Sequence, residues 1–297
     1  MEVTTKPNFT GTMRHLFSIF MPMEGFAMAG RAIGVFLLVL GTVFGGGLVS
    51  AQVYHNAAPG DMAYKVKLAI ERVQLALAPN DEYRAQLHTA FADRRMDEVA
   101  RLAEQPSRVQ LVPATLVAFG AEINALQSGL ETLRVSDPNG VVETAKLMER
   151  KIAVYQNVLS KASATLPENA LASVTTSRDL LDGVSIKAMA VIVEKHIAGD
   201  TEAPKTVLVT KFEEHLKVAE AKLDSATQDS ASKTTEAKAA IAATKQLLKE
   251  EKYEAALSKM EEVVHLTNEV EQDTKTEATT TPTPPASPTK ESAPPAK

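Results

Sequence analysis

The sequence predicts an all-α protein: a single transmembrane helix, then an extracytoplasmic array of amphipathic helices in hairpins or a bundle, then a disordered Thr/Pro tail. Beyond residue 57, apolar residues recur every three to four positions, which is the helical period. The stretch Ala32–Ala51 contains no charged residue. After Val270 there is no Val, Ile, Leu, Met or Phe, and such a proline-rich segment cannot offset the entropy of folding.

Composition excludes several classes of function. The chain has 297 residues and a formal net charge of -5, which is spread along it, so no basic field indicates a nucleic-acid partner. Aromatic residues make up 5% and tryptophan is absent, which leaves few platforms on which bases or sugars could stack. The absence of cysteine rules out disulfides and thiolate metal sites.

Residues 1–30 are predicted to be a short cytoplasmic leader, and residues 31–51 a transmembrane anchor or uncleaved signal. At about 1.5 Å per residue, the uncharged run spans roughly 30 Å, the thickness of the hydrocarbon core of a bilayer. Basic residues near its two ends are equal in number, so the positive-inside rule does not set the orientation. Arg31 directly precedes the run and favours a cytoplasmic N-terminus with an extracytoplasmic C-terminal region.

A candidate cleavage site follows the apolar run. Val49, Ser50 and Ala51 resemble the small-residue site that a signal peptidase cuts, which supports the same orientation. Secretion after cleavage near Ala51 is therefore the alternative to a single-pass location in the cell membrane. The leader is long and the apolar core exceeds the usual signal length of about 7–15 residues, and both features favour the uncleaved anchor.

Three glycines, Gly34, Gly41 and Gly45, share one face of the predicted anchor, and Gly41 with Gly45 forms a G-x-x-x-G pair. Such a pair lets two membrane helices approach closely, so these residues are candidates for anchor packing. The alternative is that glycines are simply common in membrane segments and that here they loosen the end of the helix. The sequence does not predict the oligomeric state.

A helical hairpin is predicted at residues 57–105. Pro59-Gly60 forms a turn just outside the bilayer, and Asp61 is a suitable N-cap for the helix that follows. The apolar stripe of that helix comprises Val66, Ile70, Val73 and Leu77. Lys67 and Glu71 lie off the stripe, spaced to pair, and are expected on a solvated face. A second helix starts at Asp81 and folds back on the first.

The hairpin carries a family resemblance at residues 57–104. It includes the segments "APGDMAYKVKLAIERVQLALAP" and "DEYRAQLHTAFADRRMDEVARLAE". These resemble a bacterial extracytoplasmic domain family of unknown function, with the motif P-G-D-x-x-Y-x-x-K followed by amphipathic helices. The matching residues are Pro59, Gly60, Asp61, Tyr64 and Lys67. The resemblance implies a position beside a single transmembrane segment, in envelope proteins and in proteins resembling anti-sigma factors, and it brings no catalytic residues.

Residues 106–200 are predicted to form a helical region. Its helices are Leu111–Arg134, Val141–Ala164 and a third that opens at Pro167. Gly183 is a candidate break in the third helix, and Gly199 closes it. The segment Ala188–Val193 is β-branched enough for a strand, but it is short and isolated and is therefore assigned to the helix.

Residues 205–272 are predicted to form a hairpin of long helices. A heptad seam along the first of them comprises Val209, Phe212, Leu216, Ala219, Leu223 and Ala226. Pairing within the chain, against Thr234–Glu271, is favoured over a coiled coil with a partner. The segment "LLKEEKYEAALSKMEEVVHL" is similar to the helix–turn–helix junction of tetratricopeptide repeats, but it occurs once, so a hairpin and not a solenoid is expected. Residues 273–297 are the disordered tail.

No catalytic, cofactor-binding or metal-ligating residues are predicted, so the chain is not expected to be an enzyme. Its six histidines are scattered, and none pairs with another at helical spacing. His215 follows two glutamates and is expected on a solvated, charged face. The phosphate-binding glycine loops and the G-x-S-x-G motif are absent.

The sequence therefore predicts a membrane-anchored bacterial envelope protein that acts by protein–protein contact, as a scaffold or in an adhesion-like role. It predicts an unidentified protein partner, no cofactor and no nucleic acid. The alternative is an extracytoplasmic sensor or regulator related to anti-sigma factors. A third candidate is an enzyme whose carboxylates converge from distant helices. Only residues 1–30 would be available on the cytoplasmic side to bind a sigma factor, which favours the first.

Overall fold

The structure, a computed structural model, describes residues 57–138, 140–224 and 231–280, with side chains as far as residue 273. Every regular element in these ranges is a helix, which confirms the all-α prediction. The chain divides into two compact units, Met1–Pro79 and Asn80–Lys297, and each is described by itself. The predicted anchor, its three glycines and the candidate cleavage site lie outside the described residues.

In the first unit, Pro59, Gly60 and Asp61 form a turn that leads into helix α4 (Met62–Ala76). Gly60 has a φ of +100°, which a residue with a Cβ rarely adopts. The N–H of Asp61 donates to the carbonyl of Ala58 at 3.0 Å, and the Asp61 carboxylate accepts from the N–H of Ala58 at 2.9 Å. Asp61 therefore occupies the predicted N-cap position, but its side chain closes the turn and does not cap the helix.

The buried face of α4 differs from the predicted one. Lys67 and Glu71 are 1% and 3% exposed, whereas Val66 and Leu77 are 40% and 63% exposed. The prediction of a solvated face is therefore wrong for Lys67 and Glu71, although Lys65 is exposed as expected. Residues four apart share a helix face, and buried charges are tolerated when they have partners, as both of these have. Apolar periodicity considers only apolar residues, so it cannot detect buried charges.

Replacing Gly60 by alanine is expected to loosen the turn. No atom blocks a Cβ there, but a φ of +100° strains any other residue by about 1–3 kcal/mol. The amide of Asp61, which donates across the turn, should then exchange its hydrogen at least about tenfold faster. Gly183→Ala is the control, because Gly183 lies within a helix in open space, where alanine stabilises by about 1 kcal/mol. Unchanged exchange at Asp61 would contradict this account of the motif.

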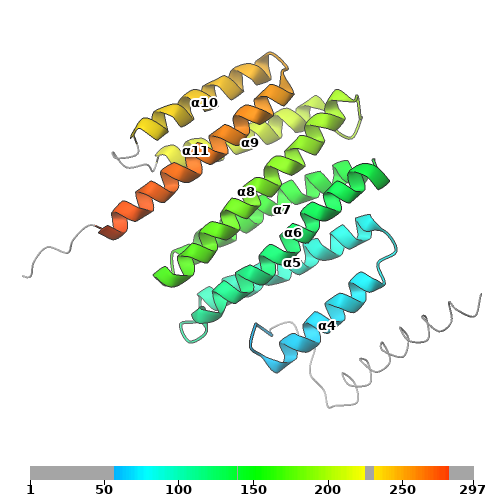
Figure 1. Cartoon of the computed structure of the whole chain (residues 1–297), viewed down its shortest axis with the longest axis vertical. Helices are drawn as coiled ribbons and strands as arrows, with labels where there is room; N and C mark the ends of the chain where they lie inside the picture. The colour runs from blue at the N-terminus through cyan, green and yellow to red at the C-terminus, as the bar shows by residue number, and fades with distance from the viewer. Residues whose placement is uncertain (1–56, 139, 225–230, 281–297) are drawn as a thin grey trace, which may run out of the picture. The chain divides into compact units, whose positions relative to one another are not determined.

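The second unit contains the other helices of the described chain (Figure 1). They are α5 (Asp81–Ala103), the short 3-10 helix η1 (Val109–Leu111), α6 (Val112–Ser136), α7 (Gly140–Ser163), α8 (Glu168–Ile197), α9 (Lys205–Asp224), α10 (Ala231–Lys249) and α11 (Tyr253–Thr280). Asn80 caps α5 by accepting the N–H of Tyr83 at 2.7 Å. Helices α6, α8 and α11 lie in one layer and α5, α7 and α9 behind them, so apolar stripes are buried between the layers.

The apolar core lies between these two layers. Phe119 on α6 packs edge-to-face against Tyr155 on α7, with ring centroids 5.1 Å apart. The Tyr155 hydroxyl donates to Asp93 on α5 at 2.8 Å, and burial together with the Asp93 charge raises the pKa of the Tyr155 phenol. Other core side chains with almost no exposed surface are Phe91, Ile123, Leu130, Leu133, Leu159, Leu181 and Met189.

Helix α8 is long and unbroken, so the candidate break at Gly183 is wrong. A glycine inside a helix costs only about 1 kcal/mol, and the burial of flanking side chains on α8 offsets this cost. The predicted end at Gly199 is confirmed by its φ of +81°. The N–H groups of Gly199 and Asp200 donate to the carbonyls of His196 and Lys195, each at 3.0 Å, as in a glycine-terminated helix.

The region predicted as a hairpin of long helices contains three helices, α9, α10 and α11. The seam of α9 contacts α8 and α11, as expected for pairing within the chain. Its buried residues are Leu208, Phe212, Leu216, Ala219 and Leu223, so the seam begins at Leu208 and not at Val209. Helices α10 and α11 form a hairpin through Glu250–Lys252, which lies at the predicted repeat-like junction.

Helix α11 continues to Thr280, past residue 273, where the sequence predicts the start of the disordered tail. The added turns contain Lys, Glu and Ala, which favour helix, and the first proline of the tail is Pro282. The helix therefore extends until proline approaches. The rest of the predicted tail, residues 281–297, lies outside the described residues.

Among the described residues, one helical segment, Val109–Ser136, is long and apolar enough to cross a membrane. It comprises η1 and α6, and α6 contacts α5, α7 and α8 within the second unit. Its buried side chains, among them Phe119 and Leu130, belong to the core described above. The span predicted from the sequence, residues 31–51, is a different segment and precedes the described part of the chain.

Candidate functional site

A network of polar side chains joins α7, α8, α9 and α11. At its centre the carboxylate of Glu149 on α7 lies against His215 on α9, with 2.8 Å between Oε2 and Nε2. The hydroxyl of Ser185 on α8 donates to the other oxygen of Glu149 at 2.6 Å. Glu149 and Ser185 are 4% and 1% exposed, so three helices meet at a buried charge.

Ser185, His215 and Glu149 are the residue types of a nucleophile–base–acid triad, but they lack its geometry. In such a triad the serine and the acid bind different imidazole nitrogens, so that a proton can pass from the hydroxyl to the ring. Here Ser185 Oγ lies 3.1 Å and Glu149 Oε2 lies 2.8 Å from the same nitrogen, Nε2. The hydroxyl donates to Glu149 instead. This arrangement joins helices and does not activate Ser185 as a nucleophile.

The environment of His215 favours its protonated form. Burial lowers the pKa of the His215 imidazole, but the hydrogen bond and charge of Glu149 and the charge of Asp182 outweigh it. Lys211 opposes them only weakly, so the pKa of His215 is raised above its usual value. The contact with Glu149 is therefore an ion pair over a wider range of pH than for an ordinary histidine.

Asp182 on α8 is a second centre of the network. One carboxylate oxygen accepts from the Gln156 amide of α7 at 2.6 Å, and the other accepts from the Asn268 amide of α11 at 2.9 Å. Lys222 of α9 lies 3.6 Å from Asp182 and donates to Asn268 at 2.9 Å. Asp182 thus connects the helices before residue 200 to those after it.

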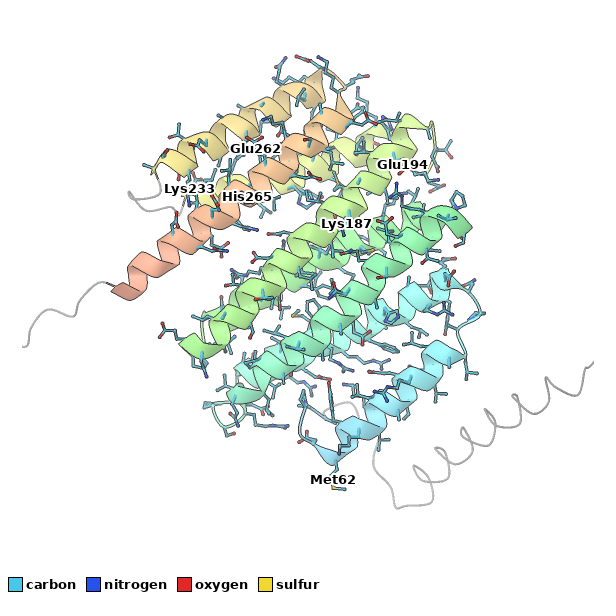
Figure 2. All side chains as sticks on the ribbon, in the orientation of Figure 1. Met62, Lys187, Glu194, Lys233, Glu262 and His265 are labelled. Atoms are coloured by element: carbon cyan, nitrogen blue, oxygen red, sulfur yellow. The ribbon has the colours of Figure 1, made fainter. Side chains whose placement is uncertain are left out.

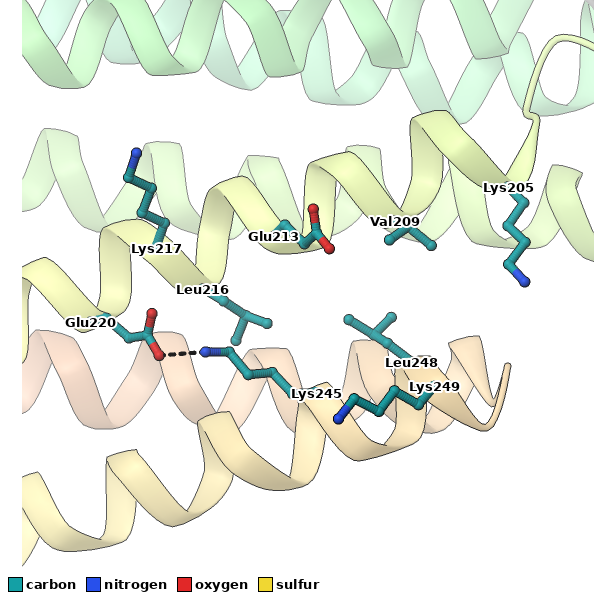
Figure 3. Close-up of a pocket in the computed structure, with 9 residues that line it drawn as sticks. All are labelled: Lys205, Val209, Glu213, Leu216, Lys217, Glu220, Lys245, Leu248 and Lys249. Atoms are coloured by element: carbon teal, nitrogen blue, oxygen red, sulfur yellow. Dashed lines mark hydrogen bonds and ion pairs between the residues drawn. The ribbon is translucent and has the colours of Figure 1, made fainter.

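An open groove of about 580 Å³ lies between α9 and α10 (Figure 3). Its apolar floor consists of Val209 and Leu216 on α9 and Leu248 on α10, of which Leu216 is fully buried and the others are half-buried. Its charged rim consists of Lys205, Glu213, Lys217, Glu220, Lys245 and Lys249. We call this site the α9/α10 groove. It combines an apolar centre with exposed charged side chains on both helices.

The lysines of the rim differ in their partners. Lys245 pairs with Glu220 across the groove at 2.6 Å, and Lys205 pairs with Glu251 at one end. Lys217 and Lys249 are exposed and form no ion pair with another residue in the described part of the chain. The groove therefore presents two cations that are available to an incoming anionic group.

Sequence reasoning missed both the polar network and the groove. The side chain of His215 is only 22% exposed and pairs with Glu149, so the expectation of a solvated face is wrong. A signal was present, because His215 lies three residues after Phe212 and beside Leu216, at the edge of the apolar seam. Which residue would face it could not be read from the sequence, since Glu149 lies 66 positions away.

The predicted family-motif residues lie together at the start of the first unit. Pro59, Gly60 and Asp61 form the turn, Tyr64 is half-buried on the first turns of α4, and Lys67 is buried. Their roles in the structure are conformational, since they set the turn and begin the helix. Among the described residues, no group of three or more His, Asp and Glu side chains could hold a metal ion.

These features define an all-α chain whose first unit contains a proline–glycine–aspartate turn and whose second unit packs its helices in two layers. Residues 56–173 match a family described as a domain of unknown function (DUF5667). The match covers α4 to α7 and the start of α8, so the family resemblance is confirmed and extends well beyond residue 104. No curated protein and no solved structure matches the chain. The α9/α10 groove lies outside the matched residues.

Proposed function

We propose that the chain is a membrane-anchored bacterial envelope protein whose helices act by protein–protein contact, in a scaffold or adhesion-like role without enzymatic activity. The uncharged run Ala32–Ala51 is long enough to cross a bilayer, and Arg31 before it favours an extracytoplasmic location for the helices. The alternative fate, secretion after cleavage near Ala51, would leave the same helices outside the membrane.

The α9/α10 groove is the observation that carries the contact role. Protein interfaces combine an apolar centre with a polar rim, and the groove has both. The polar network supports the same role, because Glu149, Ser185 and His215 tie α9 to α7 and α8. One wall of the groove is therefore held by buried hydrogen bonds before any partner binds, which lowers the ordering cost of binding.

An extracytoplasmic regulator related to anti-sigma factors is the second candidate, favoured by the motif of residues 59–67. An anti-sigma factor must bind its sigma factor in the cytoplasm, and a stable interface uses roughly 20–30 residues of each partner. In the proposed topology, residues 1–30 would have to supply nearly all of that interface. We therefore propose that the contact surface lies on the helices and not on the leader.

The absence of cysteine allows a direct test with single-cysteine variants of the full chain. Lys249→Cys on α10 is exposed and should react with a membrane-impermeant maleimide in intact spheroplasts. Thr4→Cys in the leader should react only after lysis. The reverse pattern would put the helices in the cytoplasm and overturn the envelope assignment.

The same labelling tests the contact role in membranes. A photoactivatable cross-linker on Lys249→Cys is expected to give a discrete cross-linked product of higher mass. Lys187→Cys is the matched control and should give less of this product, because Lys187 is exposed on α8 and does not line the groove (Figure 2). If no exposed position on the helices gives a cross-linked product, the contact role is wrong.

A further inference from the structure

We propose that the α9/α10 groove binds an acidic amphipathic helix of a partner protein. This proposal rests on the proposed contact role and names the chemistry of the partner. Helix-in-groove recognition places apolar side chains at positions i, i+3 or i+4, and i+7 into an apolar floor. The groove offers such a floor, with charged side chains along both of its edges.

The apolar floor has the dimensions of a helix-binding site. Val209 and Leu216 are seven residues apart on α9, which is roughly 10 Å along the helix and matches two anchor side chains seven residues apart on a ligand. Leu248 of α10 supplies the opposite wall (Figure 3). Helices α9 and α10 both contact α11. A helix lying between α9 and α10 would therefore become the fourth member of a four-helix arrangement.

The charged side chains of the rim indicate which charge on the ligand would be complementary. Four lysines face two glutamates around the groove. Glu220 is already paired with Lys245, and Lys205 is paired with Glu251 outside the groove. Lys217 on α9 and Lys249 on α10 stand on opposite edges without such partners in the described part of the chain. Carboxylates on both flanks of a ligand's apolar stripe would meet them, and such complementarity sets specificity and association rate.

Other occupants fit the groove less well. Residues 281–297 of the chain itself contain two lysines and one glutamate, so their charge has the same sign as that of the rim, and their six prolines disfavour a helical ligand. The leader, residues 1–30, contains two glutamates against one lysine and one arginine, so it has no excess of negative charge, and in the proposed topology it lies across the bilayer. An anionic lipid surface would meet the carboxylates of Glu213 and Glu220 on the rim, which repel it.

The test uses the full chain in nanodiscs of zwitterionic lipid and a fluorescent synthetic helix of about 18 residues. The acidic probe carries leucines at helical spacing and glutamates elsewhere, and the basic probe carries lysines in place of the glutamates. Fluorescence anisotropy should show that the acidic probe binds and that added salt weakens binding. The basic probe should bind at least about tenfold more weakly.

Paired charge reversals locate the probe. Lys217→Glu with Lys249→Glu should weaken binding of the acidic probe by about tenfold or more. The matched control is Lys187→Glu with Lys238→Glu, which makes the same change of net charge at exposed positions that do not line the groove and should change affinity less than about twofold. Leu248→Ala, which keeps all charges, should also weaken binding through the lost apolar contact.

Several outcomes would overturn the proposal. These are equal binding of both probes, equal effects of the two paired reversals, or no binding of the acidic probe. Competition by vesicles of anionic lipid would assign the groove to lipid, and tighter probe binding after removal of residues 281–297 would assign it to the tail. If the probe fails but the cross-linked product from exposed helix positions persists, only the groove assignment fails and the contact role stands.

Discussion

Replacing His215 by alanine is expected to lower the free energy of unfolding by about 3 kcal/mol and the thermal midpoint by roughly 6–12 °C. The substitution leaves the carboxylate of Glu149, which is 4% exposed, with Ser185 as its remaining partner within the cluster. Removal of one partner of a buried ion pair is costly, because the other charge stays buried without compensation. Thermal unfolding followed by circular dichroism measures the effect.

The stabilisation by His215 should also depend on pH in a defined direction. The pKa of His215 is raised in the folded protein, so its contribution is fully present below the unfolded pKa of about 6.5. It is lost as pH rises through the higher folded pKa. The difference in stability between the wild type and His215→Ala should therefore be largest near the unfolded pKa of about 6.5 and just below it, and should shrink as pH rises above that value.

His265 provides the control for this experiment. Its side chain is 72% exposed on α11, so His265→Ala should change the thermal midpoint little at any pH (Figure 2). If the curves of stability against pH for the wild type and His215→Ala run parallel, the ion pair with Glu149 does not form as described.

The second large effect is expected at Asp182. Asp182→Ala leaves the Gln156 amide without its acceptor and leaves the Asn268 amide with only its 3.5 Å contact to Asp179. It also removes a charge close to Lys222. A buried donor left unsatisfied costs about 1–3 kcal/mol, and these two donors are half-buried, so the free energy of unfolding should fall by about 2 kcal/mol in urea denaturation. Asp182 connects α7 and α8 to α9 and α11, so unfolding of the second unit should be monitored with probes on both sides.

Asp179→Ala is the matched control for Asp182→Ala. Asp179 lies one turn earlier on α8, is exposed and contacts Asn268 only at 3.5 Å, so its loss should cost less than about 1 kcal/mol. An effect at Asp182 no larger than that at Asp179 would contradict the role of Asp182 as a centre of the network. A wild-type transition that separates into two steps would show that the network does not couple the two sets of helices.

Features that depend on neighbouring residues in the chain were predictable. The turn at Pro59-Gly60 follows from a proline and a glycine in the two central positions, and the end of α8 at Gly199 follows from the same freedom of glycine at positive φ. The extent of the candidate site was not predictable. The α9/α10 groove lies between Val209 on α9 and Leu248 on α10. The distance between these two helices depends on how each of them packs on α11.

The period of apolar residues determined that this chain is built of helices, because a stripe repeating every three to four positions can be buried only in that form. Residues with turn and cap chemistry determined most of the helix ends, because these depend only on neighbouring positions in the chain. Tertiary packing alone decided that Lys67 and Glu71 are buried, that Gly183 stays helical and that His215 meets Glu149. Such contacts depend on which helices become neighbours, and a periodic pattern specifies the face a helix buries without specifying the helix that covers it.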